Sequence, residues 1–420
     1  MKRLLTVTFF TGILTLFKMI AGFIVAKVVA IYTGPVGIVL LGQIQSIVAG
    51  LNGVVNAPGG AGVVRYTAEN INHGPEKCAP WWRASIRWVI IILGIVMPLT
   101  ILSSKYMASA LLGDTKYTWV IIITGLMLPF SAFGTFISSI INGAQNYKAY
   151  VFIGLFSTVL STIVMVLFVY FNGVNGALLA VAIQNSIIGL IMMAFIFKQH
   201  WFKWEYIWGA CESERMGDIK NYILMAVTSA LVVPLSLIFV RKIIIHFVGW
   251  DEAGYWQAIW KISETYLMVV TIALGTYFLP QLAMIKSPKA VFREINKTLI
   301  IVLPIVALCS LTIYLARSEI IAILFSRDFL LAQELMPVQL VGDILKISSW
   351  LYAYIMISKG MTKIFIFSEV FFACSFTLLV YFFVKHYGVI GAPIAYVVNY
   401  LIYFIFSFSL VLNFSFKKQV

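Results

Sequence analysis

The hydrophobic pattern of the chain consists of long apolar blocks separated by short polar or glycine-rich connections. A block of about 20 apolar residues is long enough to cross a bilayer as a helix. The first block continues to about Tyr32 without a small-residue cleavage site, so we interpret it as a retained span and not a signal peptide. The blocks predict twelve transmembrane helices, at residues 4–32, 37–58, 84–103, 117–141, 148–171, 175–197, 218–246, 253–280, 298–317, 335–358, 364–384 and 389–414.

The same pattern repeats at one fixed offset along the chain, which takes residue 173 to residue 388. The segment "GVNGALLAVAIQN" (173–185) resembles "GVIGAPIAYVVNY" (388–400), and "VAKVVAIYTGPVG" (25–37) resembles "VRKIIIHFVG" (240–249). Glycine-rich stretches such as "YTGPVG" and "FNGVNG" predict tight turns between antiparallel helices. Because six spans per half is an even number, both halves keep the same orientation, and the repeat predicts two six-helix lobes related by an axis along the membrane normal.

The repeat also predicts the domain organisation. We expect an N-terminal lobe at residues 1–200, a cytoplasmic linker at 201–217 and a C-terminal lobe at 218–420. The Trp and Tyr residues clustered around the linker are typical of an amphipathic segment at the level of the lipid headgroups.

Composition agrees with an all-α integral membrane protein. Of the 420 residues, 61% are hydrophobic and 11% are charged, which leaves too little polar surface for a soluble protein of this size. The net charge is +14. With the N-terminus inside, nineteen Lys and Arg residues fall in inside segments and seven, including Arg241 and Lys242, in outside segments. This bias predicts cytoplasmic termini, so the basic charge is an insertion signal and no nucleic-acid partner is expected.

No motif in the sequence indicates an enzyme. The four cysteines lack metal-ligand or redox spacing, and we find no glycine-rich phosphate loop, Ser/His/Asp set or pair of catalytic carboxylates. We therefore expect neither a metal nor a cofactor.

Charged residues inside the predicted spans are the candidates for function. Lys18, Lys27, Lys261 and Lys346 lie within spans, as do the carboxylates Glu264, Asp343 and Glu369. A charge at the bilayer centre costs about 2.5–3.5 kcal/mol on insertion scales, so such residues are rare without a role. One interpretation is structural: the members of two pairs three residues apart, Lys261 with Glu264 and Asp343 with Lys346, neutralise each other. The other is that these faces line a water-filled cavity.

A cavity lined by cations would favour an anionic cargo, because Lys and Arg bind phosphate through charge-assisted hydrogen bonds. Lys18 and Lys27 are nine residues apart, on opposite sides of a regular helix. Both could face one cavity only if the helix bends, for example near Gly22; otherwise Lys27 extends toward the interface. The carboxylates could balance charge or carry a coupling ion.

The stretches "WDEAGYWQA", "YFLPQL", "QLVGDILKI" (339–347) and "AKVVAIYTGPVGIVLLGQ" (26–43) resemble a known family. They are similar to the polysaccharide-precursor flippases of the multidrug/oligosaccharidyl-lipid/polysaccharide exporter (MOP) superfamily, specifically the O-antigen translocase and lipid III flippase group. The resemblance implies that an undecaprenyl-pyrophosphate-linked oligosaccharide, of the O-antigen or enterobacterial common antigen type, is moved from the cytoplasmic to the periplasmic face of a bacterial inner membrane by alternating access.

The resemblance also implies a cationic central cavity and partners. The cavity candidates in this sequence are Lys18, Lys27, Arg65, Lys261 and Lys346, and the candidates for coupling or charge balance are Glu264, Asp343 and Glu369. The expected partners are the lipid-linked glycan, membrane lipid, and a polysaccharide polymerase with its chain-length regulator.

Three alternatives belong to other classes. A drug/cation antiporter of the same superfamily typically has a carboxylate in the first helix, where this chain has Lys18 and Lys27. A major-facilitator transporter usually has an Asp-Arg-rich loop after its second helix, and the loop here lacks one. A membrane glycosyltransferase or polymerase needs an acidic or His-rich cluster, which the short outside loops do not offer.

Overall fold

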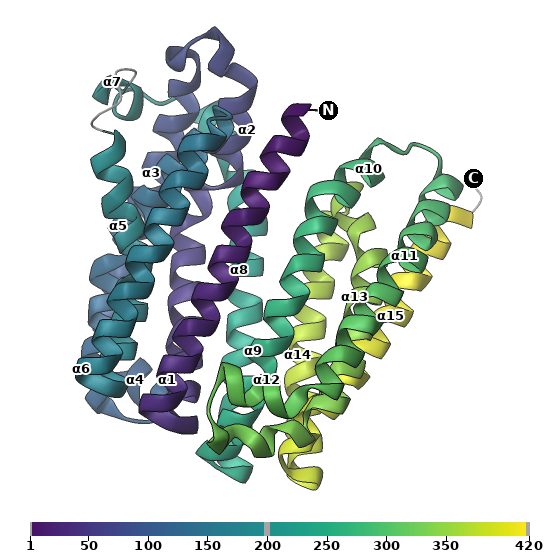
Figure 1. Ribbon diagram of the computed structural model, residues 1–420. Helices are drawn as coiled ribbons and strands as arrows, with labels where there is room; N and C mark the ends of the chain where they lie inside the picture. The colour runs from purple at the N-terminus through teal and green to yellow at the C-terminus, as the bar shows by residue number, and fades with distance from the viewer. Residues whose placement is uncertain (1, 197–201, 417–420) are drawn as a thin grey trace. The chain divides into compact units, whose positions relative to one another are not determined.

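The computed structural model describes residues 2–196 and 202–416, and these residues are almost entirely helical, with no β-strand among them (Figure 1). The long helices are α1 (Lys2–Asn56), α3 (Pro75–Leu102), α5 (Thr118–Gly143), α6 (Tyr147–Ile196), α8 (Ser213–Val248), α9 (Trp250–Ala273), α11 (Pro288–Leu315), α13 (Met336–Ser358), α14 (Thr362–Tyr387) and α15 (Gly391–Phe416). The short ones are α2 (Ala61–Asn70), α4 (Ser104–Leu112), α7 (Trp204–Ile207), α10 (Leu279–Met284) and α12 (Arg317–Leu324). Short 3-10 helices, the longest of them at Arg327–Glu334, and a π-helical segment (Leu274–Phe278) lie between them.

Eight helical stretches in the described residues are long and apolar enough to cross a membrane. Three of them, at Gly12–His73, Lys148–Ile196 and Thr362–Phe416, have 62, 49 and 55 residues, while one crossing takes about 20. Each of these three is therefore long enough for two crossings. The predicted all-α membrane fold is confirmed, whereas the count of twelve spans stays a prediction.

The long stretches reverse direction at glycine. Gly34 inside α1 has φ 63° and ψ −165°, and Gly173 inside α6 has φ 53° and ψ −128°. Residues with a Cβ atom rarely adopt such left-handed backbone conformations, so the turns predicted from "YTGPVG" and "FNGVNG" depend on these two positions. Gly176 is needed for a different reason, because a Cβ there would lie 1.8 Å from the Phe168 carbonyl oxygen.

Backbone geometry supports the repeat predicted from the sequence. Six of the positive-φ residues form pairs that share the offset of the sequence repeat: Gly34 and Gly249, Gln145 and Gly360, Gly173 and Gly388. Gln145 is the only positive-φ residue in the described chain that is not glycine, at φ 55°. The common offset means that the two halves place their helix-ending turns at equivalent positions.

By internal contacts the chain forms two compact units. Unit 1 comprises residues 1–32 and 40–235, and unit 2 comprises residues 33–39 and 236–420. The turn at Gly34 thus lies in unit 2, where Pro35 touches Gly254. Helix α8 contributes residues to both units. The predicted lobe boundaries at 200 and 218 stay a prediction.

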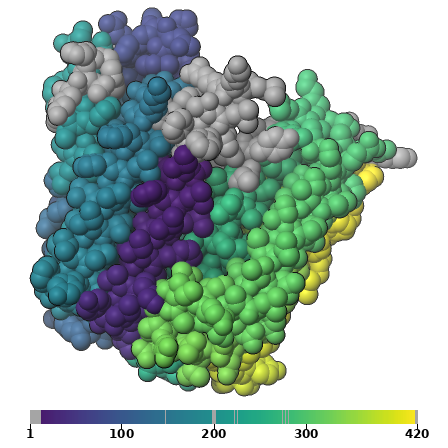
Figure 2. Space-filling model, in the orientation of Figure 1, coloured from purple at the N-terminus to yellow at the C-terminus, as the bar shows by residue number. Residues whose placement is uncertain are grey.

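Unit 1 brings α1, α5 and α6 into close contact. A Cβ on Gly154 of α6 would lie 2.9 Å from Leu14 of α1, and one on Gly134 of α5 would lie 2.6 Å from the Gly189 backbone of α6. In Figures 1 and 2, α1 and the first part of α6 run side by side along one face of this unit. Glycine at both contacts lets the helices approach closely, as is common in membrane helix packing.

The linker after α6 docks onto α3 in unit 1. Arg83 donates hydrogen bonds to the backbone carbonyl oxygens of Glu205 and Ala210, and Arg87 donates to that of Gly209. Trp204 and Trp208 are 60% and 68% exposed, as expected for a segment at the headgroup level. The beginning of the linker, 197–201, lies outside the described residues.

Unit 2 has its core between α11, α13 and α15. Leu351, Tyr352 and Ile355 of α13 are buried against partly buried aromatic side chains of α15. A Cβ on Gly342 would lie 2.2 Å from the Tyr396 ring, so this glycine lets α13 approach α15. In Figure 1, α11 and α15 lie side by side, with α13 next to them.

Candidate functional site

A buried carboxylate organises the centre of unit 2. Asp343 of α13 has no exposed surface. Its Oδ2 accepts hydrogen bonds from Ser263 Oγ (2.7 Å) and Tyr266 OH (2.9 Å) of α9, and its Oδ1 accepts one from Tyr396 OH (3.0 Å) of α15. Three hydroxyl donors from two neighbouring helices therefore hold one anion, which is how a charge can be kept inside a membrane protein.

A lysine surrounded by aromatic rings lies one helical turn further along α13. Lys346 Nζ is 5.6 Å from the ring centre of Trp260, 5.0 Å from Trp350, 5.9 Å from Tyr396 and 5.7 Å from Tyr400. Cations at such distances are attracted by the faces of aromatic rings. Tyr396 contacts both Asp343 and this lysine, so the two charges belong to one site.

Arg241 of α8 is a further charged residue of unit 2, and its expected place in an outside segment is wrong. It is 2% exposed and donates from Nε to Gln257 Oε1 at 2.7 Å. α8 continues as a helix to Val248, which carries Arg241 into the folded unit. The apolar residues on both sides of "VRKIII" were the available signal for this placement.

Glu264 is exposed on α9, within electrostatic range of both Arg241 and Lys346. Lys261, on the same helix, is half-buried. No ion pair joins Lys261 to Glu264, or Asp343 to Lys346, in the part of the chain that the structure describes. Asp343 and Lys346 nevertheless lie one helical turn apart in one site and affect each other electrostatically, so the structural interpretation of this pair stays a prediction.

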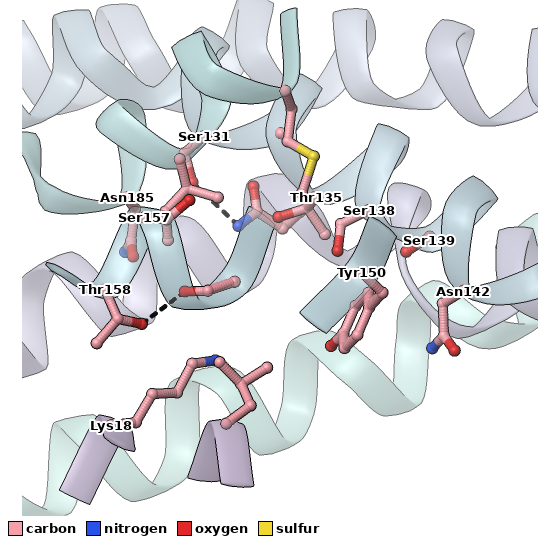
Figure 3. A pocket seen from close by; sticks show the side chains of 16 residues that line it. Lys18, Ser131, Thr135, Ser138, Ser139, Asn142, Tyr150, Ser157, Thr158 and Asn185 are labelled. Atoms are coloured by element: carbon pink, nitrogen blue, oxygen red, sulfur yellow. Dashed lines mark hydrogen bonds between the residues drawn. The ribbon is translucent and has the colours of Figure 1, made fainter. Parts of the chain in front are cut away.

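Lys18 lines a pocket within unit 1 (Figure 3). The pocket has a volume of about 380 Å³ and lies between α1, α5 and α6. Asn142, Tyr150, Thr158 and Asn185 are among the neutral polar side chains around it. In Figure 3, Lys18 lies on one side of this space and the hydroxyl and amide groups lie on the other.

The remaining candidates lie apart from these two places. Lys27 is half-buried on α1, which stays helical at Gly22 and turns only at Gly34, so the bend considered near Gly22 is absent. Arg65 of α2 is exposed and pairs with Glu69 (2.8 Å) and Tyr222. Glu369 of α14 is half-buried. The candidates thus divide between the two units, and a common cavity for Lys18 and Lys261 stays a prediction.

Comparison with known proteins extends over nearly the whole chain. It is 27% identical over 401 residues to the lipid III flippase of Escherichia coli (strain K12), a match that covers 94% of each protein, and the lipid III flippase of Shigella flexneri matches with the same values. The resemblance predicted from the sequence is confirmed. No protein-family model matches the chain.

Solved structures of the MOP superfamily have the same fold. An inward-facing multidrug resistance MATE family transporter superposes with a TM-score of 0.73 at 15% identity and covers 96% of both chains. A Vibrio cholerae MATE transporter gives a TM-score of 0.63 at 17% identity and covers 100% of this chain and 97% of its own. The two-lobe fold of MOP transporters is therefore the fold of this multi-pass membrane protein, whereas such low identity says nothing about cargo.

Proposed function

We propose that this protein flips an undecaprenyl-pyrophosphate-linked oligosaccharide from the cytoplasmic to the periplasmic leaflet of a bacterial inner membrane. The observation that carries the proposal is the similarity to lipid III flippases, which extends over 94% of the chain. The cargo has the chemistry of an O-antigen unit or of enterobacterial common antigen. Both termini lie in the cytoplasm in this proposal, in agreement with the excess of Lys and Arg in the inside segments.

The charges within the membrane helices support an anionic cargo. Arg241, Lys261 and Lys346 in unit 2 are cations on helices that are otherwise apolar. Glu264 and Asp343 offset only part of this charge. A pyrophosphate entering a cavity lined by such groups would be stabilised by charge-assisted hydrogen bonds. A cavity shared by Lys18 and Lys261 between the lobes, where transporters with parallel repeats bind their substrates, is part of the proposal.

Asp343 and Glu264 have different roles in this mechanism. Asp343 is saturated by three hydroxyl donors, so we assign it the task of holding α9, α13 and α15 together beside Lys346. Glu264 is exposed and interacts with two cations, so it can balance their charge while the cavity is empty and release them to an anion that enters. Glu369, half-buried on α14, is the candidate for a coupling ion.

Complementation tests the proposal. The gene is expressed in a strain that lacks its own flippase, and surface polysaccharide is measured together with the amount of protein in the membrane. Restoration by the wild type, and loss of restoration by Lys346→Met at equal abundance, is the expected result. The competing function, export of cationic drugs, predicts drug resistance in the same strain without restoration of surface polysaccharide.

A further inference from the structure

The pocket in unit 1 is unusual for its lining. Among the described residues, ten of its sixteen lining residues are neutral and polar, and Lys18 is the single charged one. The volume of about 380 Å³ is in the range of small-molecule sites, roughly 300–1,000 Å³. All sixteen residues belong to unit 1.

Many of the polar groups around the pocket have no partner in the protein. The side chains of Thr135, Ser138, Asn142 and Asn185 make no hydrogen bond to any other described residue. Asn56 donates to Ser131, but its Oδ1 is buried without a partner. Of the first four, Asn142 is exposed and the other three are half-buried, so these groups are open to water or to a ligand, and either can pair them at the cost that an unpaired group within a membrane would otherwise carry. The pocket therefore offers a set of donors and acceptors to a polar guest.

The repeat contrasts part of this lining with the equivalent positions of unit 2. At the offset that pairs Gly173 with Gly388, four of the small polar residues around the pocket correspond to large aromatic residues of unit 2. The equivalent pairs are Thr135 and Trp350, Ser139 and Tyr354, Ser157 and Phe372, and Asn185 and Tyr400. All four aromatic side chains belong to the hydrophobic core of unit 2. At these four positions, the space that is filled in unit 2 is therefore kept open and polar in unit 1.

The charge in the pocket fits a sugar better than a pyrophosphate. A pyrophosphate joined to both a lipid and a sugar carries two negative charges in a compact group, and one exposed lysine can neutralise only one of them. Neutral hydroxyl and amide groups match a ligand with many hydroxyl groups. Leu14, Ile188, Met192 and the ring of Tyr150 add apolar surface, which the C–H faces of a sugar ring can cover.

We propose that the pocket of unit 1 binds a sugar ring of the glycan, while the pyrophosphate is bound by cations elsewhere. The proposal rests on the proposed flippase function. Asn142 and Asn185 supply donors and acceptors for ring hydroxyls, and Lys18 at the edge pairs with a hydroxyl or with one anionic substituent. The pocket thus makes the protein select glycan-bearing lipid over the bare lipid carrier.

Binding of three probes to the full-length protein in nanodiscs tests the proposal. The probes are lipid III, undecaprenyl pyrophosphate without sugar, and the water-soluble oligosaccharide released from lipid III. The wild type is expected to bind lipid III at least tenfold more tightly than the bare lipid. The double variant Asn142→Ala/Asn185→Ala should lose roughly tenfold in affinity for lipid III and for the oligosaccharide, with the affinity for undecaprenyl pyrophosphate unchanged within twofold.

A matched pair of variants controls for damage to the fold. Thr158 and Thr162 lie one turn apart on α6, and each donates its hydroxyl to the backbone carbonyl four residues earlier at 2.7 Å. Thr158 lines the pocket and Thr162 does not. Thr158→Val should weaken lipid III binding two- to fivefold, and Thr162→Val should leave it unchanged.

The outcomes separate this proposal from the flippase function. If lipid III and the bare lipid bind equally well and the oligosaccharide does not bind, the sugar site is overturned and the flippase function stands. If the oligosaccharide binds through Asn142 and Asn185 but neither lipid binds, the flippase function is overturned and the sugar site stands. If the double variant binds all three probes like the wild type, the assignment of this pocket is wrong.

Discussion

Replacing Asp343 should destabilise unit 2 more than any other change of one charged residue in it. Asp343→Ala would remove an anion that is fully buried and would leave three hydroxyl donors, at 2.7, 2.9 and 3.0 Å, without their acceptor. Each hydrogen bond to a charged group contributes about 1.5–3 kcal/mol, but the three share one acceptor and do not add. We therefore expect a loss of about 3–5 kcal/mol in the free energy of unfolding, as for a broken buried ionic network.

The double-mutant cycle with Lys346 gives the sharper result. Lys346→Met keeps the apolar contacts with the rings and loses the cation–π attraction, so it should cost about 1–2 kcal/mol. In Asp343→Asn the lysine keeps its charge without the anion nearby, and the double variant removes that charge as well. The cost of Asp343→Asn/Lys346→Met should thus be at least about 1 kcal/mol smaller than the sum of the single costs.

Unfolding of the purified protein in mixed micelles by increasing SDS, followed by tryptophan fluorescence, measures these free energies. Thr162→Val, a change at a half-buried position of α6 in unit 1, serves as the control and should have little effect on unit 2. The reasoning is refuted if Asp343→Ala costs less than about 1 kcal/mol, or if the costs of the two single variants add within about 0.3 kcal/mol.

Three further predictions concern single positions. Glu264→Gln should reduce transport, measured by a transport assay, because Glu264 balances two cations. Lys261→Gln should change protein abundance little, measured by immunoblot, because Lys261 makes no ion pair with Glu264. Gln145→Gly should stabilise the protein by about 0.5 kcal/mol, because Gln145 has a φ of 55°, which glycine adopts without strain. The equivalent position in the other half is Gly360, and Gly360→Ala should destabilise the protein by about 1 kcal/mol in the same SDS titration. Arg65→Ala should change the free energy of unfolding by less than about 1 kcal/mol, because its pair with Glu69 is exposed; a larger loss by SDS titration would contradict this.

The sequence predicted the membrane fold and its repeat because both depend on local patterns. Apolar blocks fix which segments cross the membrane, and glycines that must adopt positive φ mark where the chain turns, so Gly34 and Gly173 were recognisable from their neighbours. The offset of the repeat, first seen in the letters of the sequence, recurs in the backbone conformations at Gly249, Gly360 and Gly388.

The hydrogen-bond partners of charged residues could not be predicted in the same way, because they come from other helices. Spacing suggested that Lys261 would pair with Glu264, but Glu264 interacts with Arg241, which comes from α8, and with Lys346, which comes from α13. Asp343 was recognised as a charge within a span, whereas its three hydroxyl donors are up to 80 residues away in the chain. Such contacts depend on how the helices pack, which no periodicity within one helix reveals.

The pocket of unit 1 was harder still to predict. Its serine, threonine and asparagine residues lie on three helices, and each one alone is an ordinary residue of a membrane helix. Lys18 was singled out as a cavity candidate because it carries a charge. Comparison of equivalent positions in the two halves was the available signal, since it contrasts Asn185 with Tyr400 and Ser157 with Phe372.

Flipping by the purified protein in proteoliposomes tests the central claim most directly. Lipid III is placed in both leaflets of vesicles with and without the protein, and a membrane-impermeant reagent that modifies the glycan reports the fraction exposed outside. The account predicts that the protein lets all of the lipid III become modified, while vesicles with Lys346→Met, or without protein, stop at the fraction initially outside. Equal modification with and without the wild-type protein, in vesicles where its folding and incorporation are verified, would contradict the account.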